Sequence, residues 1–271
     1  MNEPKRWLKP FFKGGLLMAL LGGCRQVSLP VPPSSLRPET LLVSETIDPL
    51  EYEERWRRSL AAYVAPRVFR LEVRATYRYT RETTRGTAWL FDTAGHLFTC
   101  RHVFPTQASR LEVEVWDAQG TCYPAEVVWR DTVADVAILS SALGGREGLP
   151  LKPEETAPEI GQTVVSMGAP WGLMGTLQEG FVAAPLRQLE VAPGATLPFL
   201  QLSLPAQSGS SGSPVLDRRG HVVGMVSDIA TTSGLYEGIS FAIPASVLWA
   251  VWTRYRRFAH SYDTTGSGAG D

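Results

Sequence analysis

A short run of serines and glycines at residues 207–216 carries the residue types that nucleophilic catalysis needs. It reads Gln-Ser-Gly-Ser-Ser-Gly-Ser-Pro-Val-Leu. A nucleophilic serine must be presented from a rigid corner, with backbone N–H groups aimed at the oxygen that becomes negative during acyl transfer. The pattern Gly-x-Ser-Gly-x-Pro meets this need if Ser211 is the nucleophile and Gly209 and Ser211 supply the N–H groups. A solvated turn between two strands is the structural alternative. Three other serines of the run are alternative nucleophiles: Ser208, Ser210 and Ser213.

A base that could activate this serine has to come from one of four histidines. His102 follows an apolar stretch, residues 96–100, that has the composition of a strand, so its side chain can be aimed at a neighbouring strand end. The remaining histidines occupy turns or the end of the chain: His96, His221 and His260. His102 is therefore the predicted general base.

An aspartate is predicted to orient that base. Asp135 directly precedes the apolar run at residues 136–139, where a buried carboxylate is costly unless it is hydrogen-bonded. A hydrogen bond from the Nδ1–H of His102 would satisfy it and would also fix the imidazole tautomer. Asp131 is the alternative, although its position is more typical of a turn. The chain order His, Asp, Ser is associated with chymotrypsin-type β-barrels and not with subtilisins or α/β-hydrolases.

The bulk composition is that of a globular protein with many turns. The chain has 271 residues, of which 44% are hydrophobic and 20% charged, and its formal net charge is -1. This balance argues against a nucleic-acid partner, for which a basic surface is expected. The 25 glycines and 20 prolines favour β structure over helical structure. No His/Cys spacing predicts a zinc site, and no cofactor is expected.

The N-terminal part of the chain is predicted to export and tether the protein. Residues 1–23 have the basic and apolar regions of a signal peptide, and the apolar region is too short to span a membrane. It ends in Leu21-Gly22-Gly23-Cys24, which resembles a bacterial lipoprotein signal, so Cys24 would be acylated. A plain secretory signal with an incidental cysteine is the alternative. Residues 24–47, rich in Pro and Ser, would form an extended tether. The expected location is the periplasmic face of a bacterial membrane, and Arg25 favours the outer one.

The elements that must position these residues begin after the tether, in a domain expected to cover residues 48–260. Asp48-Pro49 predicts the start of a helix that runs to about residue 62. Its apolar face would comprise Tyr52, Trp56, Leu60 and Tyr63. From Pro66 the side-chain pattern of the sequence repeats every two residues, which predicts the first strand. A second helix is predicted from residue 245 to about 259, and the Gly/Ser-rich residues 261–271 would form a disordered tail.

Five stretches along the chain form a recognisable series: residues 86–89, 95–103, 131–139, 165–173 and 236–244. In this order they resemble the sequence blocks of the trypsin-like serine proteases of the HtrA (Deg) family. The resemblance covers roughly residues 66–248 and implies an all-β fold of two six-stranded β-barrels, with the His102, Asp135 and Ser211 triad in the cleft between them. The first barrel would span about 66–143 and the second about 149–244.

The same resemblance implies where a substrate would bind. Three residues would form a strand edge that pairs with the substrate backbone, which suits extended, unfolded polypeptide: Val226, Ser227 and Asp228. Ile239 and the wall at residues 204–206 favour an apolar P1 residue. Ser210 and Ser213 depart from the family pattern, in which Asn and Gly stand at these positions. From the length of chain after Pro244 no PDZ domain is expected, and the oligomeric state stays open.

These features predict a membrane-tethered serine endopeptidase that hydrolyses extended or unfolded extracytoplasmic proteins through an acyl-enzyme intermediate. A catalytically silent lipoprotein that binds peptides is one alternative, and a purely structural lipoprotein is another. Cys100 and Cys122 could form a disulfide in an oxidising compartment or remain two buried thiols.

Overall fold

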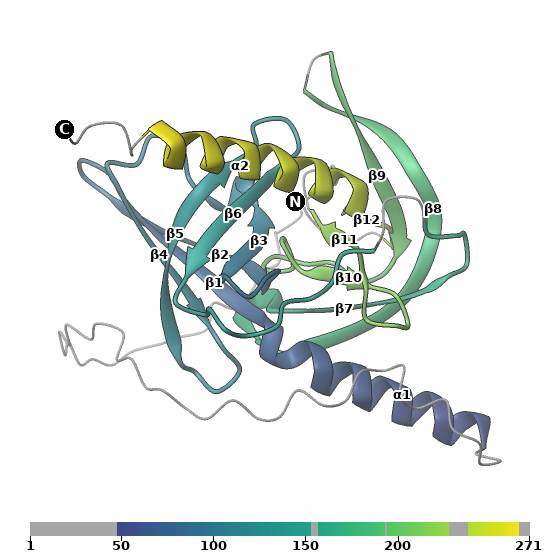
Figure 1. The fold of residues 1–271 in the computed structure, drawn as a ribbon. Coiled ribbons are helices and arrows are strands. Elements are labelled where there is room, and N and C mark those ends of the chain that lie inside the picture. The colour runs from purple at the N-terminus through teal and green to yellow at the C-terminus, as the bar shows by residue number, and fades with distance from the viewer. Residues whose placement is uncertain (1–47, 153–156, 193, 228–237, 266–271) are drawn as a thin grey trace, which may run out of the picture.

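The computed structural model describes residues 48–152, 157–192, 194–227 and 238–265, which form two closed antiparallel β-barrels (Figure 1). The strand order is β1-β2-β3-β6-β5-β4 in the first barrel and β10-β11-β12-β9-β8-β7 in the second. The predicted fold class, two six-stranded barrels with a helix at each end, is confirmed. The predicted signal peptide and tether, together with Cys24 and Asp228, lie outside the described residues.

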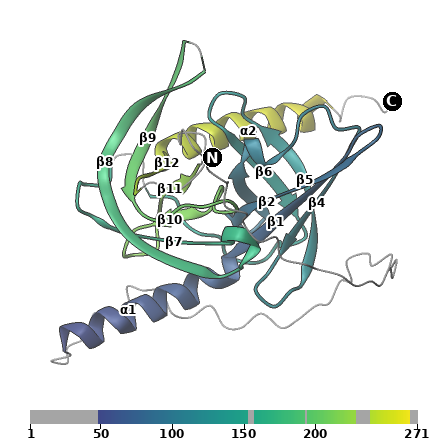
Figure 2. The same cartoon turned by 180° about the vertical axis from the view of Figure 1, so that it is seen from behind.

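Each barrel takes its six strands from one half of the domain. The first contains β1 (Val68–Thr76), β2 (Arg81–Leu90), β3 (His96–Cys100), β4 (Arg110–Trp116), β5 (Cys122–Arg130) and β6 (Val136–Ser141). The second contains β7 (Thr163–Gly168), β8 (Thr176–Ala192), β9 (Ala195–Ser203), β10 (Pro214–Leu216), β11 (Val222–Val226) and β12 (Ser240–Pro244). The long β8–β9 hairpin extends beyond its barrel, as Figure 2 shows.

Strand pairing in the first barrel brings two distant chain segments together. β1 alternates between buried and half-buried residues, as its period-two pattern predicts. β3 is mostly buried and pairs with β6, with Cys100 opposite Val136. The residues that follow β3 therefore lie beside the residue that precedes β6. This register places Asp135 next to the short 3₁₀ helix η3 (Arg101–Val103), which carries His102.

A hydrophobic core runs through both barrels and holds them together. One cluster of buried side chains includes Trp89 and Phe98 of the first barrel and Phe199 and Met225 of the second. A smaller cluster lies within the second barrel alone. Because most of the apolar contact is continuous across the junction, the two barrels are positioned by packing and not by a flexible linker.

The first helix, α1 (Pro49–Val64), packs against the second barrel. The Asp48 side chain caps it by accepting a hydrogen bond from Leu50 N–H at 2.9 Å, as predicted. Trp56 is buried and donates its Nε1–H to Arg218 O at 2.9 Å, across the β10–β11 turn. The buried side chains of α1 are Trp56, Leu60 and Val64. Trp56 and Leu60 belong to the predicted apolar face, whereas Val64 is buried in place of the predicted Tyr52 and Tyr63.

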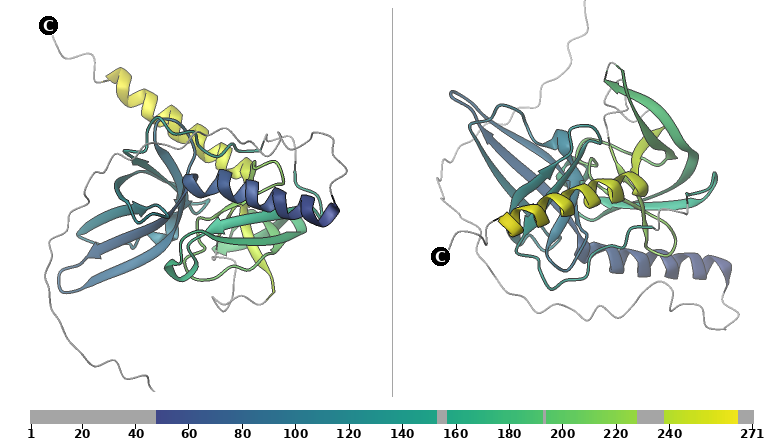
Figure 3. Two further views of the ribbon diagram at one scale, coloured as in Figure 1. Left: turned by 90° about the horizontal axis from the view of Figure 1, so that it is seen from below. Right: turned by 45° about the horizontal axis from the view of Figure 1, so that its top comes forward.

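The second helix, α2 (Ala245–Thr265), starts directly after β12 of the second barrel and lies across the first (Figures 1 and 3). Trp252 packs edge-to-face on Phe91, with ring centroids 4.8 Å apart. The helix continues beyond its predicted end at about Ala259, so the segment predicted as a disordered tail begins with helical residues. Within the described part of the chain, no helix is long and apolar enough to cross a membrane.

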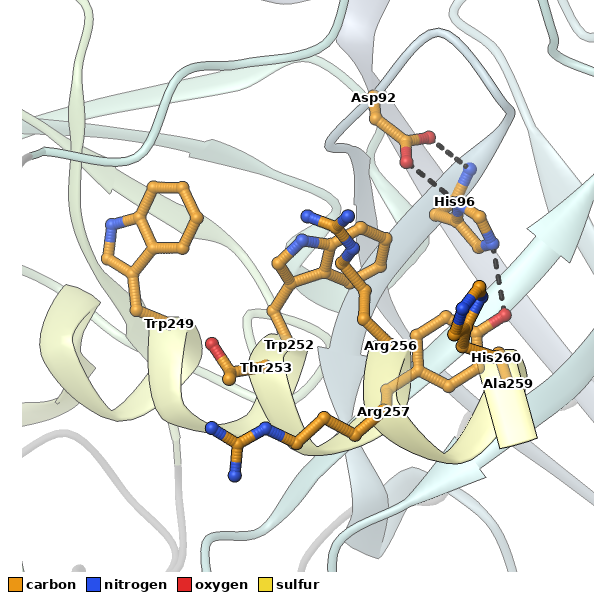
Figure 4. Close-up of a pocket in the computed structure, with 10 residues that line it drawn as sticks. Asp92, His96, Trp249, Trp252, Thr253, Arg256, Arg257, Ala259 and His260 are labelled. Atoms are coloured by element: carbon orange, nitrogen blue, oxygen red, sulfur yellow. Dashed lines mark hydrogen bonds and ion pairs between the residues drawn. The ribbon is translucent and has the colours of Figure 1, made fainter.

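A hydrogen-bonded chain of side chains pins α2 to the β2–β3 turn. His96 Nδ1 lies 2.8 Å from Asp92 Oδ2, and His96 Nε2 lies 3.1 Å from Tyr255 Oη. Figure 4 shows Asp92 and His96 beside the helix, where they help to line an open hollow of about 820 Å³. Burial, together with the nearby Asp92 charge, raises the pKa of Tyr255, so its phenol stays protonated. His96 therefore has a structural role in this arrangement.

Arg254 of α2 forms an ion pair whose contribution to stability should depend on pH. Its Nη2 lies 2.5 Å from Asp131 Oδ2. Burial alone would raise the pKa of Asp131, but hydrogen bonds from Ala134 N–H and Arg254 outweigh it, so the pKa is lowered. Because this pKa is lower in the folded than in the unfolded state, the stabilisation is present above about pH 4 and is lost as the pH falls further.

We expect Arg254→Met to lower the free energy of unfolding by about 1 kcal/mol near neutral pH, since Arg254 is half exposed and its ion pair is partly screened. The difference from wild type should shrink as the pH falls below about 4. Urea unfolding at both pH values measures it. Arg256→Met removes an exposed arginine of the same helix and serves as the matched control. An equal loss of stability at both pH values would contradict the role given to Asp131.

Candidate active site

Three side chains from distant parts of the sequence form one hydrogen-bonded chain at the junction of the barrels. His102 Nδ1 lies 2.7 Å from Asp135 Oδ2, and His102 Nε2 lies 3.0 Å from Ser211 Oγ. Asp135 and Ser211 are buried, whereas the His102 side chain is 30% exposed. This geometry allows His102 to take the Ser211 proton while the Asp135 carboxylate holds the His102 ring in the required tautomer.

The Asp135 carboxylate is held from both barrels. Its Oδ1 accepts a hydrogen bond from His102 N–H at 2.9 Å, and its Oδ2 accepts one from Ser227 Oγ at 3.0 Å in addition to the contact with His102 Nδ1. The Asp135 main chain has a φ of 55°, a left-handed conformation that aspartate tolerates better than most residues. Its carbonyl accepts a hydrogen bond from Arg101 N–H at 3.0 Å. The backbone and the side chain of Asp135 therefore both fix the segment that carries His102.

The alternatives to these residues have other roles. Asp131 accepts hydrogen bonds from Val133 N–H and Ala134 N–H, as a turn residue does, and pairs with Arg254. Ser210 Oγ accepts a hydrogen bond from Gln207 N–H at 3.1 Å within its own turn. Ser213 is buried against Gly168. The hydroxyl that contacts His102 Nε2 is that of Ser211.

The turn that presents Ser211 depends on a glycine at residue 209. Gly209 has a φ of 93°, and a Cβ built there would lie 2.5 Å from Ala169 O. The preceding carbonyl, Ser208 O, accepts a hydrogen bond from Trp171 N–H at 2.7 Å. Because the peptide is trans and planar, the N–H of Gly209 points away from Trp171. Trp171 belongs to the 3₁₀ helix η4 (Pro170–Gly172) and has a φ of 52°, a strained value for a bulky residue.

Thr87 of β2 connects this turn to the first barrel, and sequence reasoning missed it as a functional residue. Its Oγ1 donates to Gly209 O at 2.9 Å and accepts from Ala169 N–H at 3.0 Å. Its N–H donates to Ser211 O at 2.9 Å. The Thr87 carbonyl accepts from Thr99 Oγ1 at 2.7 Å, and Thr87 is fully buried. The only signal in the sequence was its place in the block at residues 86–89.

Thr87→Val should lower kcat by about tenfold to a hundredfold, with a smaller change in KM, because it leaves the buried Gly209 carbonyl without its hydroxyl donor. Thr87→Ser keeps the hydroxyl and should keep most of the rate. Steady-state kinetics on a peptide substrate measure both variants, and thermal unfolding checks that each is folded. If Thr87→Ser loses as much kcat as Thr87→Val, the hydroxyl does not position the turn.

The predicted substrate-binding residues are only partly brought together. The N–H of Val226 donates to Ser213 O at 2.9 Å, and its carbonyl accepts from Gly212 N–H at 2.9 Å, so Val226 braces the nucleophile turn. Its N–H is not open to a substrate strand, which corrects the prediction for that residue. Ser227, the next residue, donates its N–H to Phe241 O at 3.0 Å and its Oγ–H to Asp135 Oδ2 at 3.0 Å. Ile239, which directly precedes β12, is 45% exposed.

Cys100 lies directly behind the triad as a buried thiol. Its Sγ–H donates to Val226 O at 3.2 Å. Cys100 is therefore not bridged to Cys122.

Comparison with known proteins identifies the class of protein that this fold and site define. The trypsin-like peptidase domain family matches residues 86–225, more than half of the chain. The chain therefore belongs to the trypsin-like peptidases. The chain is also similar to serine endoproteases of the HtrA/Deg family, the family whose sequence blocks it resembles.

Two curated relatives and one solved structure illustrate this similarity. A probable periplasmic serine endoprotease, DegP-like, of Halomonas elongata is 33% identical over 171 residues, which cover 63% of this chain and 35% of the relative. Serine endoprotease DegS of Salmonella typhimurium is 28% identical over 237 residues, which cover 85% and 62%. The HtrA-type protease AlgW with tripeptide has a TM-score of 0.61 and 26% identity, over 72% of this chain and 61% of that one. The chain thus spans about a third of the DegP-like relative and under two thirds of the other two.

Proposed function

We propose that the protein is a membrane-tethered serine endopeptidase that hydrolyses extended or unfolded extracytoplasmic polypeptides. The observation that carries the proposal is the unbroken chain of contacts from Asp135 through His102 to Ser211, with heavy-atom distances of 2.7 and 3.0 Å. Both distances lie within hydrogen-bond range, so His102 can accept the Ser211 proton and Asp135 can orient the His102 ring.

The reaction would proceed in two steps through an acyl-enzyme. Ser211 Oγ attacks the substrate carbonyl carbon while His102 Nε2 takes the hydroxyl proton. The resulting imidazolium is stabilised by the Asp135 carboxylate, which accepts the hydrogen bond from Nδ1–H. His102 then gives the proton to the departing amine, and the C–N bond breaks. In the second step, water attacks the ester carbon and gives a proton to His102. The ester C–O bond then breaks, His102 returns the proton to Ser211 Oγ, and the carboxylic acid product leaves.

The oxyanion of each tetrahedral intermediate would be bound by the N–H groups of Gly209 and Ser211. The hydrogen bond from Trp171 to Ser208 O supports this assignment, because it turns the Gly209 N–H away from the protein wall formed by Trp171. Thr87 stabilises the same turn by binding Gly209 O and Ser211 O. Such preorganised donors are worth about a hundredfold to a thousandfold in kcat each.

The proposed substrate is an extended chain that adds a strand at Ser227. Two observations support a polypeptide substrate. The AlgW relative was solved with a tripeptide, and Ser227 lies beside the triad through its bond to Asp135. The exposed Ile239 and the predicted wall at residues 204–206 are proposed to favour an apolar P1 residue.

Ser211→Ala should abolish hydrolysis of a denatured protein, with a loss of about a millionfold in kcat, and should abolish labelling by a fluorophosphonate probe. Ser213→Ala is the matched control, because Ser213 lies in the same turn without contacting His102 and should leave the labelling intact. Labelling that persists in Ser211→Ala would refute the assignment of the nucleophile. A folded wild-type protein that neither labels nor cleaves would be a peptide-binding module instead.

Cys24 is proposed to anchor the protein by its acyl chains, with residues 24–47 as the tether. The proposal rests on the run of residues at positions 21–24 and on the periplasmic location in the name of the DegP-like relative. Cys24→Ser should move the protein from the membrane fraction to the soluble fraction and remove the mass of the lipid from its N-terminal peptide. Fractionation and mass spectrometry measure the two effects. An unmodified Cys24 in the wild-type protein would refute the anchor.

A further inference from the structure

Three possible metal ligands converge at the buried side of the proposed triad. One ligand atom each from Cys100, His102 and Asp135 lies within 4.8 Å of the other two. Cys100 and Asp135 are buried, and the His102 side chain is 30% exposed. Sulfur, imidazole nitrogen and carboxylate oxygen form a ligand set that suits Zn²⁺. We infer that this cluster binds a thiophilic divalent cation of the zinc class, and that the bound cation inhibits the protease.

The framework around the cluster is rigid enough to hold a cation. Cys100 is the last residue of β3, and Asp135 directly precedes its partner residue Val136 on β6. Hydrogen bonds from Arg101 N–H and His102 N–H to Asp135 hold the segment that carries Asp135 against the segment that carries His102. Donor atoms around tetrahedral Zn²⁺ lie roughly 3.5 Å apart, so small side-chain movements would close the site. The exposed imidazole provides the way in from the cleft.

Charge balance favours binding at this buried position. On binding, the Cys100 thiol gives its proton to solvent and becomes a thiolate. The thiolate and the Asp135 carboxylate together neutralise a divalent cation, so no net charge is buried. Three protein ligands leave a fourth position for water, as in open zinc sites.

Inhibition follows from the tautomer of His102, and this step rests on the proposed function. The ring nitrogen that faces Asp135 is Nδ1, and a cation bound there takes the place of its proton. The neutral ring then carries its proton on Nε2, which faces Ser211 Oγ. A protonated Nε2 is a donor and cannot accept the serine proton. The metal-bound protein would therefore keep its fold while being unable to activate the nucleophile.

Binding is tested with Co²⁺ on the full-length Ser211→Ala protein, which separates binding from catalysis. We expect one Co²⁺ per chain, a near-ultraviolet sulfur-to-cobalt charge-transfer band, and loss of that band on addition of Zn²⁺. Cys100→Ser in the same background should lose the band, and Cys100→Ala provides a second variant if the first is poorly folded. A band that persists in these variants would not come from Cys100 and would overturn the inference. Absence of a band in the parent protein would also overturn it.

Inhibition is tested by peptidase assays. The activity of each variant with Zn²⁺, or with a chelator, is compared with the activity of the same variant without either. Wild-type activity should fall at least roughly tenfold with Zn²⁺ and return with chelator, and Cys100→Ser should need at least roughly tenfold more Zn²⁺ for the same effect. If the cobalt band forms but no wild-type activity is found, the metal site stands and the proposed function fails. If the protease is active, lacks the band and is insensitive to Zn²⁺, the function stands and this inference fails.

Discussion

A carboxylate that is 3% exposed can persist at the junction of two barrels only if its oxygens are hydrogen-bonded. Asp135 meets this constraint with donors from both sides: the main chain and ring of His102 from the first barrel and the hydroxyl of Ser227 from the second. Satisfying this one buried charge therefore aligns His102 with Ser227 of the second barrel. The hydrogen bonds that stabilise the buried Asp135 carboxylate are therefore the same contacts that would orient His102 for catalysis.

The division of the site between two barrels makes the junction itself part of the proposed active site. His102 and Asp135 come from the first barrel, whereas Ser211 comes from the second. Thr87 connects the two by binding the carbonyls on either side of the nucleophile turn. The continuous core and the helix α2, which starts on one barrel and packs on the other, oppose sliding of the barrels. A shift of about 1 Å at this junction would cost much of the rate.

The buried side of the triad is where this chain combines two chemistries. A thiol at Cys100 lies against the same His102 and Asp135 that would move protons during hydrolysis. Hydrolysis needs Nδ1 of His102 protonated and directed at the carboxylate, while a cation needs that nitrogen free of its proton. The two states exclude each other, so a thiophilic metal would act as a switch on the proposed protease and not as a cofactor.

Local sequence pattern was enough to determine the strand periodicity, the Asp48 cap, the chain order of the triad and the need for glycine at residue 209. Each of these depends on neighbours along the chain, through side-chain alternation, capping or backbone conformation. The continuation of α2 past Ala259, the engaged N–H of Val226 and the connecting role of Thr87 were decided only by tertiary structure. The last two depend on partners in other elements of the fold, Ser213 for Val226 and Gly209 for Thr87, which no local pattern encodes. The same holds for the approach of Cys100 to Asp135, because only the register of β3 against β6 brings these residues together.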